Sequence, residues 1–147
     1  MSKLKKYKMF IDGEWVDSES KKTFKTLNPE TNEPWAEVPE ANEKDIDKAV
    51  KAAQKAFEGS WPSLFPRERA SYLRAIANEL RENAELLGKI ETIDTGKLFK
   101  ETKNQANYIA EYYDYYAGLA DKVEGTVLPI DKANMQVITT RVPIGVV

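Results

Sequence analysis

Cysteine and histidine are both absent from the 147 residues of this chain. Without cysteine there is no disulfide framework and no thiolate ligand for a metal, which fits a cytoplasmic protein. Without histidine the chain lacks the commonest general base at neutral pH and the commonest zinc ligand. Its serine side chains therefore have no histidine to activate them for nucleophilic attack. The sequence predicts no catalytic residue within these 147 positions.

Long apolar runs and a large excess of charge are also missing. No stretch of 18 apolar residues is present, so no transmembrane helix is predicted. The basic start of the chain is not followed by an apolar segment, which argues against a secretory signal. The net charge of −2 gives no strong field for nucleic acid or an anionic membrane, and neither is predicted as a partner. Lys3, Lys5, Lys6 and Lys8 raise the idea of a phosphate-binding arm, but a solvated N-terminal tail is the favoured interpretation.

Glycine is sparse, and the seven glycines form no phosphate-binding loop. No G-x-G-x-x-G pattern occurs. Gly96-Lys97 resembles the end of a P-loop, but Glu91 occupies the position where the first glycine of that motif is required. We therefore predict no cofactor-binding residue in the chain.

The first forty residues have the alternation and turn chemistry of two strand pairs. Asp12-Gly13 supplies the positive φ angles of a tight hairpin, and residues 28–32 form a second turn. The predicted strands are Tyr7–Ile11, Glu14–Val16, Thr23–Leu27 and Trp35–Val38.

Four helices are predicted between residues 43 and 123. Asn42 is a good N-cap for the first helix, which ends at Gly59. Pro66 begins the second, and Asn83 separates its apolar stripe from that of a third helix that ends near Gly96. The fourth helix is expected from about residue 101 to 123. Residues 134–147 then read as extended chain, with a half-exposed strand over Met135–Arg141 and the start of a buried strand over Ile144–Val147.

Tyrosines cluster on two faces of the predicted fourth helix. Ile109, Tyr113 and Tyr116 share a face with small residues and are predicted to lie in the core. Tyr108, Tyr112 and Tyr115 form a second face that is unusually aromatic for one in contact with solvent. Two interpretations stay open: the helix is sandwiched between two layers, or this face lines a cleft for an apolar or cationic ligand.

Four segments, in this order and at this spacing, resemble the N-terminal part of the aldehyde dehydrogenase superfamily, with betaine aldehyde dehydrogenases among the similar members. Arg141–Val147 also resembles the segment that leads such proteins into their Rossmann-type cofactor domain. The four segments are Phe10–Val16, Leu27–Glu33, Asp45–Phe57, and the stretch from Glu91–Lys97 to Tyr115–Lys122.

The resemblance implies an α/β fold: the N-terminal portion of the aldehyde dehydrogenase fold, with strands of the oligomerisation sheet and about four helices. It implies that the complete enzyme oxidises an aldehyde to a carboxylic acid with NAD or NADP and forms a homo-oligomer. The catalytic cysteine of the family is absent here, so the chain alone is predicted to be inactive. The alternative is a non-catalytic oligomerisation or interaction module. Because a packing partner is missing, we expect exposed apolar patches.

Two further sites are implied by the resemblance alone. Positions that match Thr26, Leu27 and Asp94 hold a structural potassium or sodium ion in betaine aldehyde dehydrogenase-like relatives. The alternative for Asp94 is a helix-terminal residue hydrogen-bonded to the turn at Thr95-Gly96. In the family the matching helix borders the mouth of the substrate tunnel, which implies that Asn104, Tyr108 and Tyr112 face that tunnel.

Overall fold

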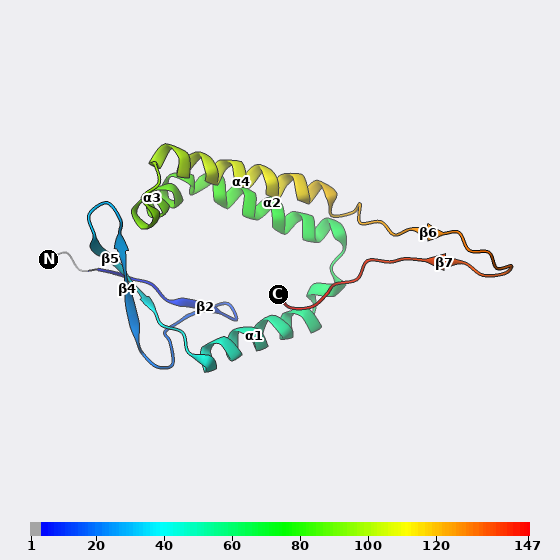
Figure 1. The fold of residues 1–147 in the computed structure, drawn as a ribbon, viewed down its shortest axis with the longest axis horizontal. Coiled ribbons are helices and arrows are strands. Elements are labelled where there is room, and N and C mark those ends of the chain that lie inside the picture. Colours follow the sequence, from blue (N-terminus) through cyan, green and yellow to red (C-terminus); the bar gives the residue numbers. More distant parts are fainter. Residues whose placement is uncertain (1–3) are drawn as a thin grey trace.

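The computed structural model describes residues 4–147, which form an open ring with a long arm (Figure 1). Helices α2 (Pro66–Glu82), α3 (Ala84–Thr95) and α4 (Phe99–Leu119) lie along one side of the ring, and α1 (Glu43–Glu58) lies on the other side. A small sheet closes the ring at the end opposite the arm. None of the helices in residues 4–147 combines the length with the apolar character that a membrane-spanning segment requires.

Two small sheets account for the first forty residues. In the larger one, β5 pairs with β4 in antiparallel and with β1 in parallel orientation. The smaller one is the predicted hairpin around Asp12-Gly13, where both turn residues have positive φ angles of 52° and 83°. The strands are β1 (Lys5–Lys6), β2 (Met9–Ile11), β3 (Glu14–Val16), β4 (Thr23–Asn28) and β5 (Glu33–Pro39).

The strand prediction was correct for the two pairs but wrong for the basic N-terminal segment. Lys5 and Lys6 lie in a strand instead of a solvated tail, because their backbone pairs with Ala36 and Glu37 of β5. Lys3 lies outside the described residues. Sequence periodicity could not reveal β1, since a two-residue parallel strand has no alternation of its own.

All four predicted helices are present, and a short 3₁₀ helix, η1 (Trp61–Ser63), precedes the second. Asn42 caps the first helix as predicted, and the carboxylate of Asp45 accepts the N–H of Asn42 in return. The fourth helix runs four residues short of the predicted end. The α-helices are α1 (Glu43–Glu58), α2 (Pro66–Glu82), α3 (Ala84–Thr95) and α4 (Phe99–Leu119).

Small side chains let α4 pack closely on α2 and α3. The buried apolar side chains of this layer are all alanines, namely Ala70, Ala77, Ala84, Ala106, Ala110 and Ala117. Gly88 of α3 lies so near α4 that a Cβ atom there would be 2.8 Å from the backbone nitrogen of Lys103. The hydroxyl of Thr102, 1% exposed, donates to the carbonyl of Gly88 at 2.9 Å at the same crossing.

The predicted aromatic core of α4 is only partly correct. Tyr113 is half-buried, but Tyr116 is 57% exposed and Ile109 is also exposed. The alanines that share these turns bring the neighbouring helix too close to accommodate large side chains, so the aromatic rings lie at the edge of the contact.

A polar link joins the loop after β3 to the start of α1. The buried carboxylate of Asp45 accepts the hydroxyl of Ser18 at 2.7 Å and the N–H of Glu19 at 3.0 Å. The hydrogen bond from the N–H of Asn42, together with those from the Ser18 hydroxyl and the N–H of Glu19, lowers the pKa of Asp45. Lys48 and Lys44 pair with Glu19 on the outside of the link and lower the pKa of Glu19.

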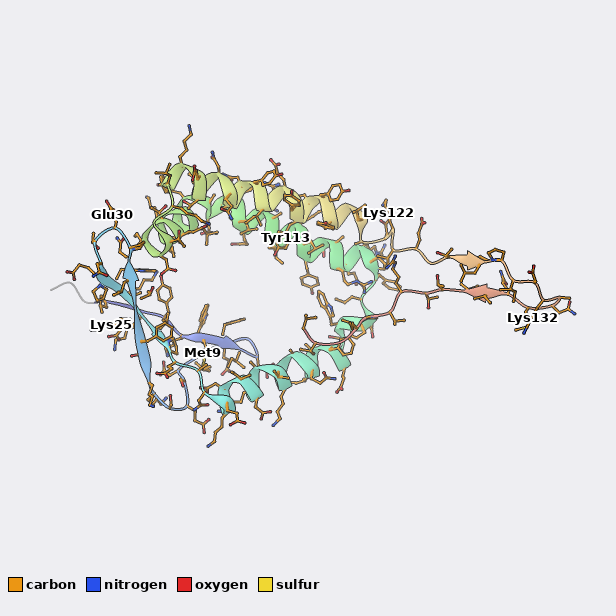
Figure 2. The ribbon with its side chains drawn as sticks, in the orientation of Figure 1. Met9, Lys25, Glu30, Tyr113, Lys122 and Lys132 are labelled. Carbon is orange, nitrogen blue, oxygen red and sulfur yellow. The ribbon has the colours of Figure 1, made fainter. Side chains whose placement is uncertain are left out.

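The arm consists of β6 (Val127–Leu128) and β7 (Val137–Ile138), which pair with each other in antiparallel orientation. Lys132 lies at its tip and Lys122 near its base (Figure 2). The predicted strand over Met135–Arg141 is therefore reduced to two residues. The predicted buried strand over Ile144–Val147 is absent, and Ile144 is 97% exposed, because no neighbouring strand is available to pair with this segment.

The expected apolar patches are present on the helical layer. Tyr72, Ile76, Leu86 and Leu87 are exposed and, with their neighbours, line an open groove of about 500 Å³ between α2 and α3. Such an apolar surface is typical of a protein face that packs against another domain or chain.

Candidate functional site

The second tyrosine face of α4 forms a shallow depression. Tyr108, Tyr112 and Tyr115 recur at the i, i+4, i+7 spacing that places them on one side of a helix, and all three are exposed. Together with Glu111 they line a hollow of about 310 Å³. On the opposite side of the helix, Ala106 and Ala110 are buried. Close packing on one side thus leaves the tyrosines directed away from the core.

Two tyrosines in this depression are ordered by each other. The rings of Tyr108 and Tyr112 meet edge to face at 5.0 Å between centroids, and their hydroxyl oxygens are 3.1 Å apart. The hydrogen bond between the two hydroxyls raises the pKa of Tyr112 above its usual value of 10.0, so Tyr112 is neutral at physiological pH. The result is an aromatic wall that can stack on an apolar group or attract a cation through the ring faces.

Asn104 lies one turn before Tyr108 and is exposed, but it is not among the residues that line the depression. The structure therefore brings together two of the three residues that were expected at the tunnel mouth. Tyr115 and Glu111 also line the depression, although neither was predicted at the tunnel mouth. Tyr115 does belong to the second tyrosine face that was predicted from the sequence. Glu111 was missed, since a lone carboxylate on an amphipathic helix gives no signal beyond a solvated position.

The second candidate site lies where α3 meets the sheet. Asp94 Oδ1 accepts the hydroxyl of Thr26 at 2.7 Å and the indole N–H of Trp35 at 3.2 Å. These hydrogen bonds differ from the alternative prediction, in which Asp94 would bind the turn at Thr95-Gly96. Trp35 was not predicted at this site. Its indole N–H needs an acceptor, and this need was the one signal in the sequence that pointed to it.

Oxygen atoms at this junction are suitable for an alkali cation. Leu27 follows Thr26 at a β-bulge, and its register partner is Pro34, which has no backbone N–H to donate to β4. The ring of Tyr7 packs edge-on against Trp35 at 6.1 Å, and its hydroxyl is buried without a hydrogen-bond partner among residues 4–147. Carboxylate, hydroxyl and carbonyl oxygens are the ligands that hard cations favour. The same described residues contain no group of three carboxylates, histidines or cysteines able to hold a metal.

The fold matches one protein family. The aldehyde dehydrogenase family pattern matches residues 15–147, and the chain belongs to this family. Its architecture is that of the N-terminal region of the aldehyde dehydrogenase fold. The expected α/β class and the family resemblance are thereby confirmed.

Curated relatives and solved structures agree on this relationship. The chain is 42% identical to (Z)-2-((N-methylformamido)methylene)-5-hydroxybutyrolactone dehydrogenase of Acinetobacter baylyi, covering 98% of this chain and 29% of that protein. It is 40% identical to betaine aldehyde dehydrogenase of Bacillus subtilis, covering 94% of this chain and 28% of that protein. The chain thus spans less than a third of the length of these relatives.

Two solved structures have a closely similar backbone. A mutant aldehyde dehydrogenase from Bacillus cereus matches with a TM-score of 0.82 and 42% identity, over 87% of this chain and 26% of that one. A betaine aldehyde dehydrogenase mutant from Staphylococcus aureus, in complex with NAD⁺, matches with a TM-score of 0.81 and 36% identity, over 88% and 26% of the two chains.

Proposed function

We propose that this chain is the N-terminal part of an NAD(P)-dependent aldehyde dehydrogenase that oxidises an aldehyde to a carboxylic acid. The observation that carries the proposal is the family match over residues 15–147. A TM-score of 0.82 to an aldehyde dehydrogenase structure supports it. The curated relatives are more than three times as long, and we assign the chemical steps to the part of the enzyme that this chain does not contain.

The chain's own residues do not fit a nicotinamide cofactor. A dinucleotide site of the Rossmann type needs a parallel sheet with a glycine-rich turn at a helix N-terminus. In residues 4–147 the one parallel pair, β1 with β5, is two residues long and no helix connects its strands as a βαβ unit. Oxidation of an aldehyde through a thiolate also needs a cysteine, and the sequence has none. We therefore expect the isolated chain to be inactive.

The contribution we propose for this chain is a wall of the substrate tunnel. Tyr108 and Tyr112 hold each other in a fixed edge-to-face arrangement, and Asn104 lies one turn away on the same side of α4. Such a wall orients an aldehyde that carries an aromatic or a quaternary ammonium group by contact with the ring faces. The pKa of Tyr112 is raised by its hydrogen bond with Tyr108, so the phenol of Tyr112 stays neutral at physiological pH and offers an uncharged ring.

A chimera tests the proposal. The part of Bacillus subtilis betaine aldehyde dehydrogenase that matches this chain is replaced by residues 15–147, and NADH formation is measured with betaine aldehyde and other aldehydes. We expect turnover by the chimera and none by the isolated chain. A chimera that folds, as judged by cooperative thermal unfolding, but does not oxidise any aldehyde would contradict the assignment. Turnover by the 147-residue chain alone would contradict it as well.

The same chimera tests the tunnel wall. Replacing Tyr108 and Tyr112 together by alanine should raise KM for a quaternary ammonium aldehyde about tenfold, since each ring contact is worth roughly 0.5–1 kcal/mol. Tyr116→Ala is the matched control, because Tyr116 is exposed on the same helix but does not line the depression. Equal changes in the double variant and the control would exclude a specific role for the wall.

We also propose that Thr26, Leu27 and Asp94 hold a structural potassium or sodium ion. One support is that the hydroxyl oxygen of Thr26 and a carboxylate oxygen of Asp94 lie 2.7 Å apart. The other is that Pro34, opposite Leu27, has no backbone N–H to donate to β4. Potassium chloride should then raise Tm above its value in choline chloride of the same ionic strength, and Asp94→Asn should abolish the difference. Asp47→Asn, on the exposed face of α1, is the control. Equal Tm values in both salts would refute the site.

The alternative function is a non-catalytic oligomerisation or interaction module. The observation that favours it is the β6–β7 arm, whose two strands pair with each other and leave their outer edges free. The two functions make different predictions for the chimera, because an interaction module confers assembly without turnover. We propose the arm as an oligomer contact in either case.

A further inference from the structure

A pocket lined by lysines lies at the sheet, at the end of the ring opposite the arm. It has a volume of about 280 Å³ and is formed by β1, the loop between β3 and β4, and the ends of β4 and β5. Tyr7, whose ring packs against Trp35 beside the candidate cation site, is the one lining residue that it shares with the sites described above. Its lining residues are Lys6, Tyr7, Lys8, Asp17, Ser18, Lys21, Lys22, Thr23, Glu37 and Pro39.

The strand register explains why these residues converge. Lys6 is opposite Glu37 in the parallel pair, and Thr23 is opposite Pro39 in the antiparallel pair. Because register partners point to the same side of a sheet, all four residues lie on one face. On the other face Ala36 is buried and its register partner Thr26 binds Asp94 of α3. The pocket therefore opens on the outer face of the sheet.

Positive charge in the pocket exceeds negative charge. Lys6 is paired with Glu37 at 3.2 Å. Lys8 and Lys21 share one carboxylate, that of Asp17, and each is 3.8 Å from it. Lys22 has no ion pair within the described chain. Four ammonium groups thus face two carboxylates, and two positive charges remain uncompensated in a concave site.

We propose that this pocket binds the phosphate group of a small anionic ligand. Lys8, Lys21 and Lys22 supply the charge, and the exposed hydroxyl of Thr23 supplies an additional donor. Ser18 lines the pocket but supplies no donor to the phosphate, because its hydroxyl already donates to Asp45. Lysine serves as a point charge with three donors, which suits a tetrahedral oxyanion approached from several sides.

Solvent exposure of the lysine side chains limits the affinity of the pocket for phosphate. The ammonium groups of Lys8 and Lys21 are on side chains that are 53% and 75% exposed, so water and salt screen them. Exposed charge pairs each change an equilibrium between about 1.4-fold and fivefold. We therefore expect binding of inorganic phosphate in the millimolar range, weakened by salt.

Titration of the full 147-residue chain with inorganic phosphate, followed by backbone amide NMR shifts, tests the proposal. We expect saturable shifts confined to the pocket residues. The triple variant Lys8→Gln, Lys21→Gln, Lys22→Gln should bind phosphate about tenfold more weakly. The control triple variant Lys51→Gln, Lys55→Gln, Lys100→Gln removes the same total charge from α1 and α4 and should change binding less than about twofold.

A variant that binds phosphate more tightly separates the proposal from misfolding, because a misfolded chain would bind phosphate more weakly. Asp17→Asn removes the carboxylate shared by Lys8 and Lys21 and should tighten phosphate binding between about twofold and fivefold. Asp47→Asn makes the same change of charge on α1 and should have no such effect. Equal losses in the two triple variants, or no gain with Asp17→Asn, would overturn the proposal. Binding to phosphatidylglycerol vesicles without binding to inorganic phosphate would overturn it too.

Discussion

The α3–α4 crossing and the β6–β7 arm lie in the same chain but are stabilised in opposite ways. At the crossing, Gly88 and the buried Thr102 bring two helix backbones into direct contact, and the Thr102 hydroxyl satisfies the carbonyl of Gly88. In the arm, two strands of two residues pair with each other and expose Val127, Ile138 and Met135. The first region combines close backbone contact with a satisfied buried hydroxyl. The second has backbone pairing but no packing layer on either face.

The difference shows that contacts within this chain fix the helical layer where small residues allow close approach, whereas the arm has no such contacts. Buried alanines and a glycine fix the helices relative to one another through many short contacts. The arm instead presents β-branched and apolar side chains that gain nothing from burial within the chain. We infer that substitutions at the crossing act on folding, and that substitutions in the arm act on association.

Gly88→Ala should give the largest effect on stability. The new Cβ would lie 2.8–2.9 Å from the backbone of Lys103, so α3 and α4 must move apart. We expect a loss of about 1–3 kcal/mol in the free energy of unfolding, measured by urea denaturation. Gly118→Ala is the control in α4. Its Cβ would meet nothing within 4 Å, so this variant should gain roughly 0.5–1 kcal/mol from helix propensity. The same sign for both variants would contradict the close approach.

The polar link at the start of α1 should have an intermediate effect. Asn42→Ala removes the N-cap and should lower the free energy of unfolding by about 1 kcal/mol.

Asp45→Asn should lower Tm at pH 7, and the difference in Tm from the unchanged chain should become smaller as the pH falls. The folded pKa of Asp45 lies below its ordinary value of 3.8, so its stabilisation is present above that pH and is lost as the pH falls through the folded pKa. Melting curves between neutral and acidic pH, with Asp47→Asn as control, measure this. A difference in Tm that stays constant with pH would contradict the link.

Ile138→Lys in β7 should have the smallest effect on folding. The side chain is exposed, and we expect a change in unfolding free energy within about 0.5 kcal/mol. If the arm is an oligomer contact, the same variant should shift the sedimentation profile toward smaller species, since a charge at a strand edge opposes pairing. Lys132→Ala at the arm tip serves as the control. A large loss of stability without a change in association would contradict the comparison drawn above.

Most of the fold could be predicted from local signals in the sequence. The hairpin followed from Asp12-Gly13, and the start of α1 followed from the N-cap residue Asn42, because both depend on residues close together in the chain. The break at Asn83 between α2 and α3 could also be predicted, because Asn83 interrupts the apolar stripe in the sequence.

The remaining features depend on partners distant in sequence. β1 exists because Lys5 and Lys6 pair with residues more than thirty positions away. Tyr116 is exposed because the helix packs through alanines, a preference that periodicity cannot distinguish from packing through aromatic rings. For the candidate sites, the pairing of Tyr108 with Tyr112 followed from helical spacing, whereas Trp35 reaches Asp94 only through the tertiary arrangement of β5 and α3.

We expect Asp94 to couple the unfolding of the sheet to that of the helical layer. Within residues 4–147, its hydrogen bonds to Thr26 and Trp35 are the side-chain hydrogen bonds that join the sheet to the helical layer, at the point where α3 meets β4 and β5. Cooperative unfolding requires that separate regions lose their structure together, and few contacts couple these two. Without the Asp94 carboxylate, amide protons of β4 and β5 would exchange with solvent independently of those in α2 and α4. The molecule would then behave as two folding units on one chain.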